Sequence, residues 1–449
     1  MNIPIFTRDT LDDILKYLQK CKGSFVFQAN GEEYLIHSAS DAEEQMKQAL
    51  SKEDYPLVKN FNHILAFYDL IEEATTFRHY PMIMQLEHTS YCNAECIMCV
   101  HYYKQNHDAR HLSSELYEKI RPAFPYLEEI VLHGNGEPFM LPNIGDILSE
   151  YKKYGISVST NTNMSILPNS VLESINAFKA LTVSFDSPRK EIYDVIRKNL
   201  DFDKVTENID KLRNVAPDLH MTLAVVSMRQ NIRDSKMLVE YAVKHGFNRI
   251  IFSRLGVNGY IKNWYDDVVH YPAITKRSMQ EAINFARASN IEIVYPDVFL
   301  MLPEGDEAEE TTRMDSYPLA HSPEKLAELR RQVSLTPKKG DFYFDEVDLM
   351  PSQYKCKGIC DLLWDNIMIT AKGEVVVCCI DVLHHIDMLD KPIDKIWNGE
   401  KYIGLRSMFF KENILPEYCR NCMFILNHGL KHLSVEIGDG FYLNQKKTK

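Results

Sequence analysis

Three closely spaced cysteines constrain this chain more than any other feature of its sequence. Cys92, Cys96 and Cys99 stand at a C-x3-C-x2-C spacing within residues 87–103. A short loop with this spacing can direct three thiolates to one point, as an iron–sulfur cluster requires. A 4Fe-4S cluster held by three cysteines leaves one iron open to a ligand that is not protein. The alternative is a structural zinc ion, which needs a fourth protein ligand, and His101 is the candidate.

Length and composition indicate a multidomain protein that does not bind nucleic acid. A chain of 449 residues is too long for one ordinary domain, and 45% hydrophobic residues can fill sizeable cores. The net charge of −12 argues against a nucleic-acid surface, because phosphate binding needs clustered lysine and arginine. No signal peptide and no apolar run of membrane-spanning length is evident. We therefore expect a cytoplasmic protein with no membrane partner, whose ten cysteines serve as metal ligands rather than disulfides.

Short apolar strands alternate with amphipathic helices between residues 81 and 303. The strands are expected at residues 82–87, 129–133, 156–160, 181–185, 221–227, 249–253 and 291–295, with helices at 114–121, 143–154, 234–245 and 278–289. This alternation is typical of parallel β/α units. The segment falls short of the ~250 residues of an eight-unit barrel. We predict an α/β fold, built as a partial (β/α)6 TIM-like barrel that is open on one side.

Polar loops follow the predicted strands, and in β/α barrels such loops build the active site. The loop after the second strand contains Gly134, Asn135, Gly136, Glu137 and Pro138. Its two glycines let the backbone approach a ligand without a Cβ clash, and the Glu137 carboxylate can accept hydrogen bonds from an ammonium group. Asn163 follows the third strand, and Ser184 and Asp186 follow the fourth.

A second group of cysteines lies after residue 350. Cys360 precedes a predicted strand at 366–370, a turn at 371–373 and a second strand at 374–377, which leads into Cys378 and Cys379. This pattern predicts a hairpin that carries a thiolate at each end. Cys419 and Cys422 form a later C-x2-C pair. On these residues alone, a four-cysteine zinc site and an iron–sulfur cluster are both open.

The cysteine loop resembles the cluster loop of the radical S-adenosylmethionine (SAM) enzymes, with Met98 in place of the aromatic residue that many members carry. The resemblance implies that the open iron binds the methionine part of SAM. Reduction of the cluster then releases a 5'-deoxyadenosyl radical, which takes hydrogen from the substrate. It also implies that residues 134–138 hold the SAM amine and that Asn163 and Ser184 contact its ribose and carboxylate. Asp186 could instead face the substrate. Arg197 resembles a recurrent arginine of the family, but a helix-surface arginine is equally open.

The second cysteine group resembles the C-terminal auxiliary-cluster domain called SPASM, or its truncated form, the twitch domain. The matching features are C-x12-G-x4-C, the Cys-Cys-Ile-Asp step, Ile396-Trp397-Asn398, Arg406 and the closing C-x2-C. Full SPASM domains need more cysteines between Cys379 and Cys419 than this chain has. The resemblance therefore implies one auxiliary 4Fe-4S cluster, with Cys360, Cys378, Cys419 and Cys422 as ligands. Cys356 or Cys379 could replace one of these four.

The sequence thus predicts five segments. Residues 1–80 form a small N-terminal α+β extension that serves as a lid or docking module, with helices at 10–21, 42–50 and 61–74 and a hairpin at 24–37. Residues 81–303 form the partial barrel, and 304–350 a linker that could reach over its mouth. Residues 351–430 form the SPASM/twitch-like domain, and 431–449 a tail.

The function that these features predict is that of a radical SAM oxidoreductase. The resemblance implies a flavodoxin or ferredoxin-type reductant as partner, and an auxiliary cluster that accepts the second electron while a base takes the proton. Candidate bases, by position only, are His101, Tyr102, Lys104, Arg254 and the residues near Trp364. The favoured substrate is a small polar molecule such as an aminocyclitol or sugar alcohol. A ribosomally made peptide, with residues 1–80 as leader-peptide binder, and a zinc-stabilised binding protein without catalysis are the alternatives.

Overall fold

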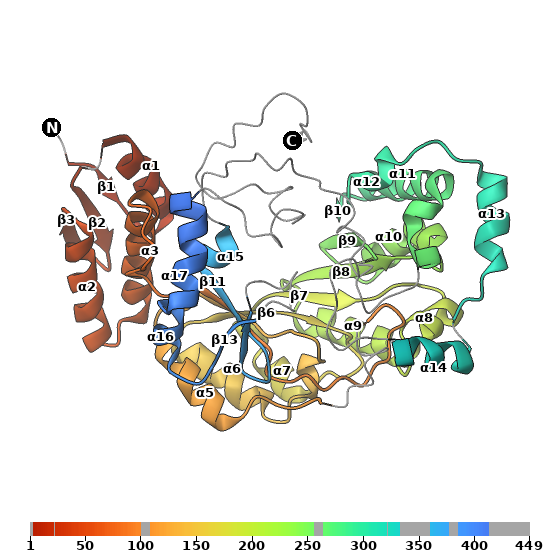
Figure 1. The fold of residues 1–449 in the computed structure, drawn as a ribbon, viewed down its shortest axis with the longest axis horizontal. Coiled ribbons are helices and arrows are strands. Elements are labelled where there is room, and N and C mark those ends of the chain that lie inside the picture. Colours follow the sequence, from red (N-terminus) through yellow and green to blue (C-terminus); the bar gives the residue numbers. More distant parts are fainter. Residues whose placement is uncertain are drawn as a thin grey trace.

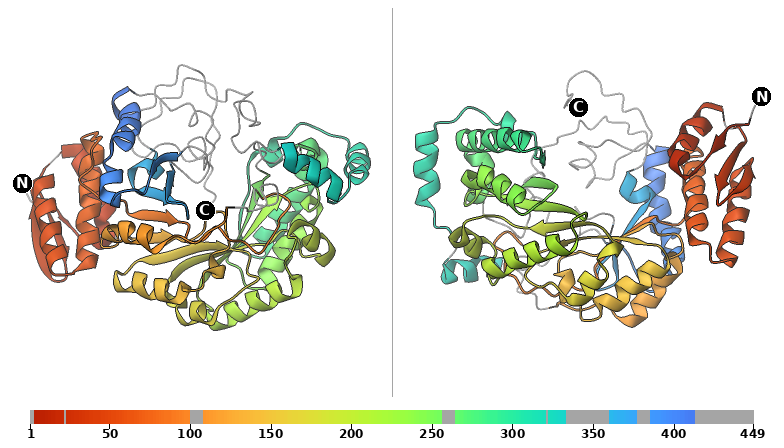
Figure 2. Two further views of the ribbon diagram at one scale, coloured as in Figure 1. Left: turned by 60° about the horizontal axis from the view of Figure 1, so that its bottom comes forward. Right: turned by 180° about the vertical axis from the view of Figure 1, so that it is seen from behind.

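The computed structural model describes residues 3–21, 23–99, 108–255, 264–320, 322–332, 360–376 and 385–412. Within these residues the chain forms a three-stranded sheet and a ten-stranded sheet. The small sheet and its helices lie at one end of the molecule, and α11 (Pro272–Ala288) and α13 (Glu307–Ser316) lie at the other (Figures 1 and 2). Among the helices of the described residues, none has both the length and the apolar character needed to span a membrane.

The N-terminal unit combines the small sheet with three helices. Its elements are β1 (Ile5–Phe6), α1 (Leu11–Cys21), β2 (Phe25–Ala29), β3 (Glu32–Ile36), α2 (Ala39–Ser51) and α3 (Tyr55–Ile71). The turn of the β2–β3 hairpin contains Asn30 and Gly31, which both have positive φ angles, as a two-residue hairpin turn requires. Helix α3 is buried along most of its length, because it packs between the small sheet and the rest of the chain.

Seven parallel strands form the centre of the large sheet, in sequence order. They are β4 (Ile83–Leu86), β5 (Glu129–Val131), β6 (Ser157–Thr162), β7 (Phe178–Ser184), β8 (His220–Ser227), β9 (Arg249–Arg254) and β10 (Glu292–Val294). Each lies within a few residues of its predicted position. The strand order ends at β10 on one side and at β13 (His385–Met388) on the other, so within the described residues the sheet does not close. The predicted α/β fold with an open, mostly parallel sheet is confirmed.

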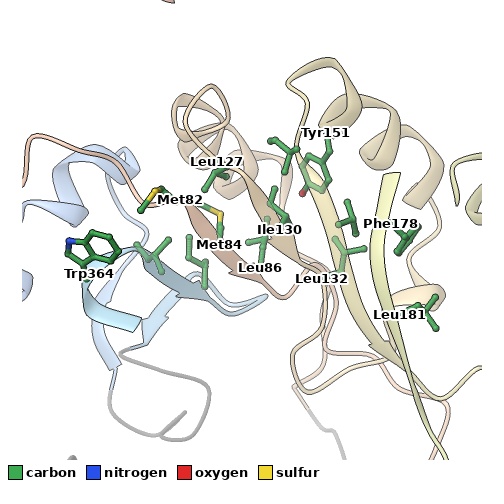
Figure 3. Packing of buried hydrophobic residues seen from close by; sticks show 14 of the residues in the cluster. Met82, Met84, Leu86, Leu127, Ile130, Leu132, Tyr151, Phe178, Leu181 and Trp364 are labelled. Atoms are coloured by element: carbon green, nitrogen blue, oxygen red, sulfur yellow. The ribbon is translucent and has the colours of Figure 1, made fainter. Parts of the chain in front are cut away.

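Helices cover one face of this sheet (Figure 1), and most strand residues that point to them are apolar and buried. The covering helices are α5 (Ser114–Ile120), α6 (Ile144–Lys153), α7 (Asn169–Glu173), α8 (Lys190–Ile196), α9 (Phe202–Val215), α10 (Ser235–Lys244) and α11. Figure 3 shows Ile130 and Leu132, on the β5 segment, beside Tyr151 of α6. Helix α11 begins six residues before its predicted start, because Pro272 suits a first helical position and Glu310 accepts the N–H groups of Ala273 and Ile274.

The auxiliary region extends the same sheet. Strand β11 (Asn366–Ile369) pairs in parallel with β4, with Asn366 opposite Ile83, and β12 (Glu374–Val376) and β13 follow in antiparallel order. Helices α15 (Asp361–Trp364), α16 (Ile393–Trp397) and α17 (Glu400–Ser407) accompany these strands. The predicted hairpin is therefore present over the described residues 366–376, and it is continuous with the parallel sheet.

The segment after β10 contains further helices. It holds α12 (Val298–Met301), α13 and α14 (Pro323–Gln332), and the last two lie in the segment that was predicted as a linker. Arg229, in the loop after β8, donates to the carbonyl oxygens of Met314, Tyr317 and Pro318 at 2.6 to 3.2 Å. The C-terminal end of α13 is therefore held at the carboxyl end of β8.

Candidate functional site

The cysteine loop follows β4 and is held against the end of α8. Two backbone hydrogen bonds join the loop to that helix end, from Glu95 N–H to Lys198 O at 2.9 Å and from Ile97 N–H to Ile196 O at 3.0 Å. Within the loop, Cys99 N–H donates to Cys96 O at 2.9 Å. Cys96 is 6% exposed, whereas Cys92 and Cys99 are partly buried. The backbone thus fixes the three thiols in one small region.

The three thiols share a low-dielectric site. The pKa of Cys92 is raised to about 12, chiefly by burial, and the neighbouring Cys96 and Cys99 contribute to this increase. Within the described residues, no three His, Cys, Asp or Glu side chains surround a point closely enough to bind a single metal ion. A cluster of several irons spreads its ligands more widely than one ion, and its positive charge offsets the cost of buried thiolates. The donor set therefore fits an iron–sulfur cluster.

Arg197 lies beside the most buried of these cysteines. Its Nη1 is 3.6 Å from Cys96 Sγ, and its Nε donates to Asp186 Oδ2 at 2.5 Å. The second carboxylate oxygen, Asp186 Oδ1, accepts the Val226 N–H at 2.7 Å. Both side chains are buried, so Arg197 is not a helix-surface residue, and the Asp186 carboxylate faces Arg197 instead of a substrate. Burial raises the pKa of Asp186, and Arg197 opposes this change.

The loop after β5 lies directly against the loop after β4, and its glycines make this approach possible. A Cβ at Gly134 would lie 2.6 Å from Cβ and Cδ of Glu87, and one at Gly136 would lie 2.7 Å from Tyr91 O. Glu137 N–H donates to Tyr91 O at 2.8 Å. The sequence predicted glycines for close approach to a ligand. In the described residues, both glycines also allow close approach of the protein itself.

The Glu137 carboxylate is turned into the protein. It accepts the Thr162 hydroxyl at 2.6 Å, the Asn163 N–H at 2.7 Å and the Phe139 N–H at 3.1 Å. Burial raises its pKa, and these hydrogen bonds oppose the change. A buried carboxylate needs such partners. Glu137 therefore joins the loops after β5 and β6, and it leaves little of its acceptor capacity for the ammonium group that the sequence suggested.

Asn163 and Ser184 occupy different surroundings. Asn163 Nδ2 donates to Asn93 Oδ1 at 3.0 Å, and its Oδ1 accepts the Ser165 N–H at 2.9 Å. Because Asn93 follows Cys92 directly, Asn163 supports the cysteine loop. Ser184, the last residue of β7, is partly exposed on the sheet face that the helices do not cover.

Glu87 is a site residue that sequence reasoning did not single out. It is 3% exposed, and its two oxygens accept backbone N–H groups from different loops, Asn135 at 2.5 Å and Ala371 at 2.9 Å. Ala371 lies 284 residues further along the chain, so no local pattern could have indicated this contact.

The remaining candidates lie partly outside the described residues. Cys360 is buried at the start of α15. Arg254 pairs with Asp267 at 2.6 Å, and a guanidinium group has no acceptor, so it does not suit the role of a base. Trp364 is buried in the core. The predicted residues that lie outside the described part of the chain are His101, Tyr102, Lys104, Cys356, Cys378, Cys379, Cys419 and Cys422.

Comparison with known proteins gives two family matches. Residues 86–242 match the Radical SAM superfamily, and residues 360–423 match an iron–sulfur cluster-binding domain, SPASM. A cofactor-modifying protein of the tungsten-containing aldehyde ferredoxin oxidoreductase from Pyrococcus furiosus is 21% identical over 360 residues, covering 76% of this chain and 86% of that protein.

Two solved structures share the fold. SuiB from Streptococcus suis, bound to the precursor peptide SuiA, gives a TM-score of 0.52 at 13% identity, over 84% of this chain and 85% of that one. The structure of anSMEcpe with bound AdoMet gives a TM-score of 0.50 at 16% identity, over 77% and 87%.

Proposed function

Because this chain belongs to the radical SAM superfamily and carries a C-terminal SPASM domain, we propose that it is an oxidoreductase acting on a small polar molecule. Membership of the family makes it an enzyme that uses SAM and a 4Fe-4S cluster, with auxiliary iron–sulfur chemistry in the SPASM domain. The substrate and the oxidative outcome are our proposal.

In this proposal, Cys92, Cys96 and Cys99 hold the first cluster. The loop of residues 134–138, together with Asn163 and Ser184, holds SAM, and Cys360, Cys378, Cys419 and Cys422 hold one auxiliary cluster. When bound, the first cluster and SAM supply a 5'-deoxyadenosyl radical that takes one hydrogen atom from the substrate, and the auxiliary cluster supplies an acceptor for the second electron. A flavodoxin or ferredoxin-type protein is the proposed reductant.

The observation that carries the substrate class is the polarity of the uncovered sheet face. Towards the carboxyl ends of the strands, the residues that alternate with the buried core include Gln85, Ser159, Asn161, Thr182, Ser184 and Ser253, beside the apolar Val131, Val226 and Ile251, all partly or fully exposed. Hydroxyl and amide groups can donate and accept hydrogen bonds without a fixed charge. Such a surface suits a hydroxyl-bearing or amine-bearing molecule, and the relative from Pyrococcus furiosus, whose name states that it modifies a cofactor, supports a non-peptide substrate.

A peptide substrate is the second candidate, and one observation favours it. Strand β3 ends the order of the small sheet, and Glu32, Glu33 and Leu35 on it are exposed. An edge strand can add an extended peptide through main-chain hydrogen bonds. Residues 1–80 would then serve as the leader-peptide binder.

The test combines reconstitution with one substitution. Anaerobically prepared protein should carry about eight irons per chain, as two 4Fe-4S clusters require, and should cleave SAM when dithionite is added. Cys96→Ala should lose about half of this iron and all SAM cleavage, because its thiolate is one of the three ligands. Cys21→Ser, in α1 and outside both cysteine groups, is the matched control. Cleavage by Cys96→Ala, or a colourless protein that contains zinc, would contradict the assignment.

The substrate class is tested by mass spectrometry of the same reaction mixtures. A panel of aminocyclitols and sugar alcohols should include a compound that loses two hydrogen atoms only when SAM and dithionite are both present. Modification of a short peptide encoded beside the gene, with no change in any small molecule, would favour the second candidate.

A further inference from the structure

Glu87 lies where three parts of the molecule meet. It follows the last residue of β4 and precedes the cysteine loop. Its Oε1 accepts the N–H of Asn135, in the loop after β5, at 2.5 Å, and its Oε2 accepts the N–H of Ala371, in the turn between β11 and β12, at 2.9 Å. The backbone amides of Ala371, Asn135 and Gly136 all lower the pKa of this carboxyl group, against the larger effect of burial. One side chain therefore holds two loops that are far apart in sequence.

The Glu87 side chain and the 134–138 loop are packed too closely to move independently of each other. A Cβ at Gly134 would lie 2.6 Å from Cβ and Cδ of Glu87, which is well inside van der Waals contact. Gly136 is equally confined on the other side, against Tyr91 O and the backbone of Ser90. Because neither glycine leaves free space, a displacement of this loop must displace the Glu87 side chain.

The turn that carries Ala371 is rigid and is fixed at a second point. Gly373 N–H donates to Thr370 O at 2.8 Å, which closes the turn, and Gly373 has a φ of +80°. Lys372 forms an ion pair with Asp108, in the segment that returns from the cysteine loop. Strand β11 runs from α15 and Cys360 to this turn, and its four residues span about 13 Å. The turn therefore lies at one end of β11, and the predicted cluster ligand Cys360 lies near the other end.

We propose that Glu87 is a positioning residue that couples SAM binding at residues 134–138 to the auxiliary hairpin. The proposal rests on the proposed function, since it takes the 134–138 loop as the SAM site. SAM that orders this loop would fix the position of the Asn135 N–H. The N–H would then hold the Glu87 carboxylate in place, and the second oxygen of this carboxylate would hold the turn at Ala371. The auxiliary hairpin would then be most firmly placed when SAM is bound.

Amide hydrogen exchange of the reconstituted full-length protein, with and without SAM, tests the coupling. In the wild-type protein, SAM should slow exchange about tenfold in two peptides, one spanning residues 131–137 and one spanning 369–374, because both lose local opening. Glu87→Gln keeps the shape of the side chain but replaces one acceptor oxygen by an NH2 group, which cannot accept an N–H. This variant should keep protection at 131–137 and lose it, to less than about twofold, at 369–374.

Two matched variants separate coupling from general damage. Ala371→Pro removes the N–H that Glu87 accepts and puts a ring carbon in its place, and proline suits the second position of such a turn. The 369–374 response should be lost here too. Glu374→Gln alters the same turn, where Glu374 accepts the Thr370 hydroxyl at 3.0 Å, but it keeps the Ala371 N–H that Glu87 accepts. It should keep the wild-type response at both peptides.

The outcomes distinguish this inference from the function on which it rests. If SAM protects residues 131–137 in the wild-type protein but leaves 369–374 unchanged, or if both responses persist in Glu87→Gln and Ala371→Pro, the coupling is wrong and the SAM site stands. If SAM protects neither peptide and is not cleaved, the proposed function itself fails. If Glu87→Gln loses iron and does not fold, Ala371→Pro decides the question alone.

Discussion

The pair of Arg197 and Asp186 is the most consequential charge arrangement near the cysteines. The guanidinium is fully enclosed between a carboxylate and the Cys96 sulfur. Removing one partner of a buried ion pair typically costs more than the pair contributes, because the remaining charge has no partner. Substitutions in this pair therefore test how much the pair contributes to the stability of the region around the cysteine loop.

We expect Arg197→Met to lower the free energy of unfolding by about 3 to 5 kcal/mol, as measured by urea unfolding of the metal-free chain. Loss of Arg197 should raise the pKa of Asp186 further above its ordinary value. A native carboxyl group with a raised pKa binds more protons than the unfolded chain, so stability falls as pH rises through this range. The destabilisation should therefore be smaller at pH 5 than at pH 8.

The double variant Arg197→Met with Asp186→Asn provides the control. It removes both charges and leaves an amide oxygen for the Val226 N–H, so much of the lost stability should return. A single variant within 1 kcal/mol of the wild type would show that the pair is not important for stability.

Sequence reasoning at the residue scale could use only local signals. The spacing of Cys92, Cys96 and Cys99, and the glycines of the loop after β5, lie within short windows. It could not reveal that Glu137 is satisfied by Thr162 and Asn163, or that Glu87 reaches Ala371, because these partners depend on how separate β/α units and the hairpin pack.

At the scale of elements, Lys59 of α3 shows how the N-terminal unit is attached. Its ammonium group donates to Tyr154 O at 2.7 Å and to Gly155 O at 2.6 Å, just beyond the end of α6. The carbonyl groups at a helix end otherwise lack partners, and a cation there also interacts favourably with the helix dipole. Burial lowers the pKa of Lys59 to about 8.

We expect Lys59→Met to lower the free energy of unfolding by about 1 to 3 kcal/mol at pH 7, because two carbonyl groups lose their donor. The native state releases the Lys59 proton near pH 8, whereas the unfolded chain keeps it to about 10.5. The unfolded state therefore holds more protons in this window, and the stability of the wild type should rise relative to the variant as pH increases from 8 to 10.5. Lys52→Met, at an exposed lysine, should show no such trend in the same pH series of urea unfolding curves.

The order of strands and helices was largely predictable, because each element has its own periodicity. All seven parallel strands lie near their predicted positions. The pairing of β11 with β4 was not predictable, since parallel pairing between distant strands leaves no local signature. The start of α11 was missed for a related reason: Glu310, which accepts two of its first N–H groups, lies on α13.

At the scale of the whole molecule, Trp364 connects the N-terminal unit to the auxiliary region. Its Nε1 donates to Ala66 O at 3.3 Å, its ring stacks on Phe67, and its carbonyl oxygen lies 2.7 Å from His79 Nε2. Trp364 ends α15, the helix that begins directly after Cys360. In the described residues the N-terminal unit thus contacts the amino ends of β4, β5 and β11, opposite the cysteine loop.

We expect Trp364→Ala to cost about 3 to 5 kcal/mol of stability and to release auxiliary iron preferentially. Iron should fall from about eight to about four atoms per chain, while the SAM-dependent change in the electron paramagnetic resonance signal of the first cluster is retained. Trp364→Phe keeps an aromatic ring in the core but loses the Nε1 hydrogen bond and part of the buried volume, so it should retain more iron than Trp364→Ala. Equal loss of iron from both clusters would contradict a specific role for Trp364 in the auxiliary region.

The shared sheet also has a consequence for biosynthesis. Strand β4 emerges from the ribosome with one edge unpaired, and its partner β11 follows roughly 280 residues later, or some 15 to 60 s at ordinary translation rates. During that interval the bare edge of β4, next to the thiols of the nascent chain, is open to strand exchange with other molecules. Protection of the nascent chain by a chaperone until β11 has been translated should therefore raise the yield of protein in active form.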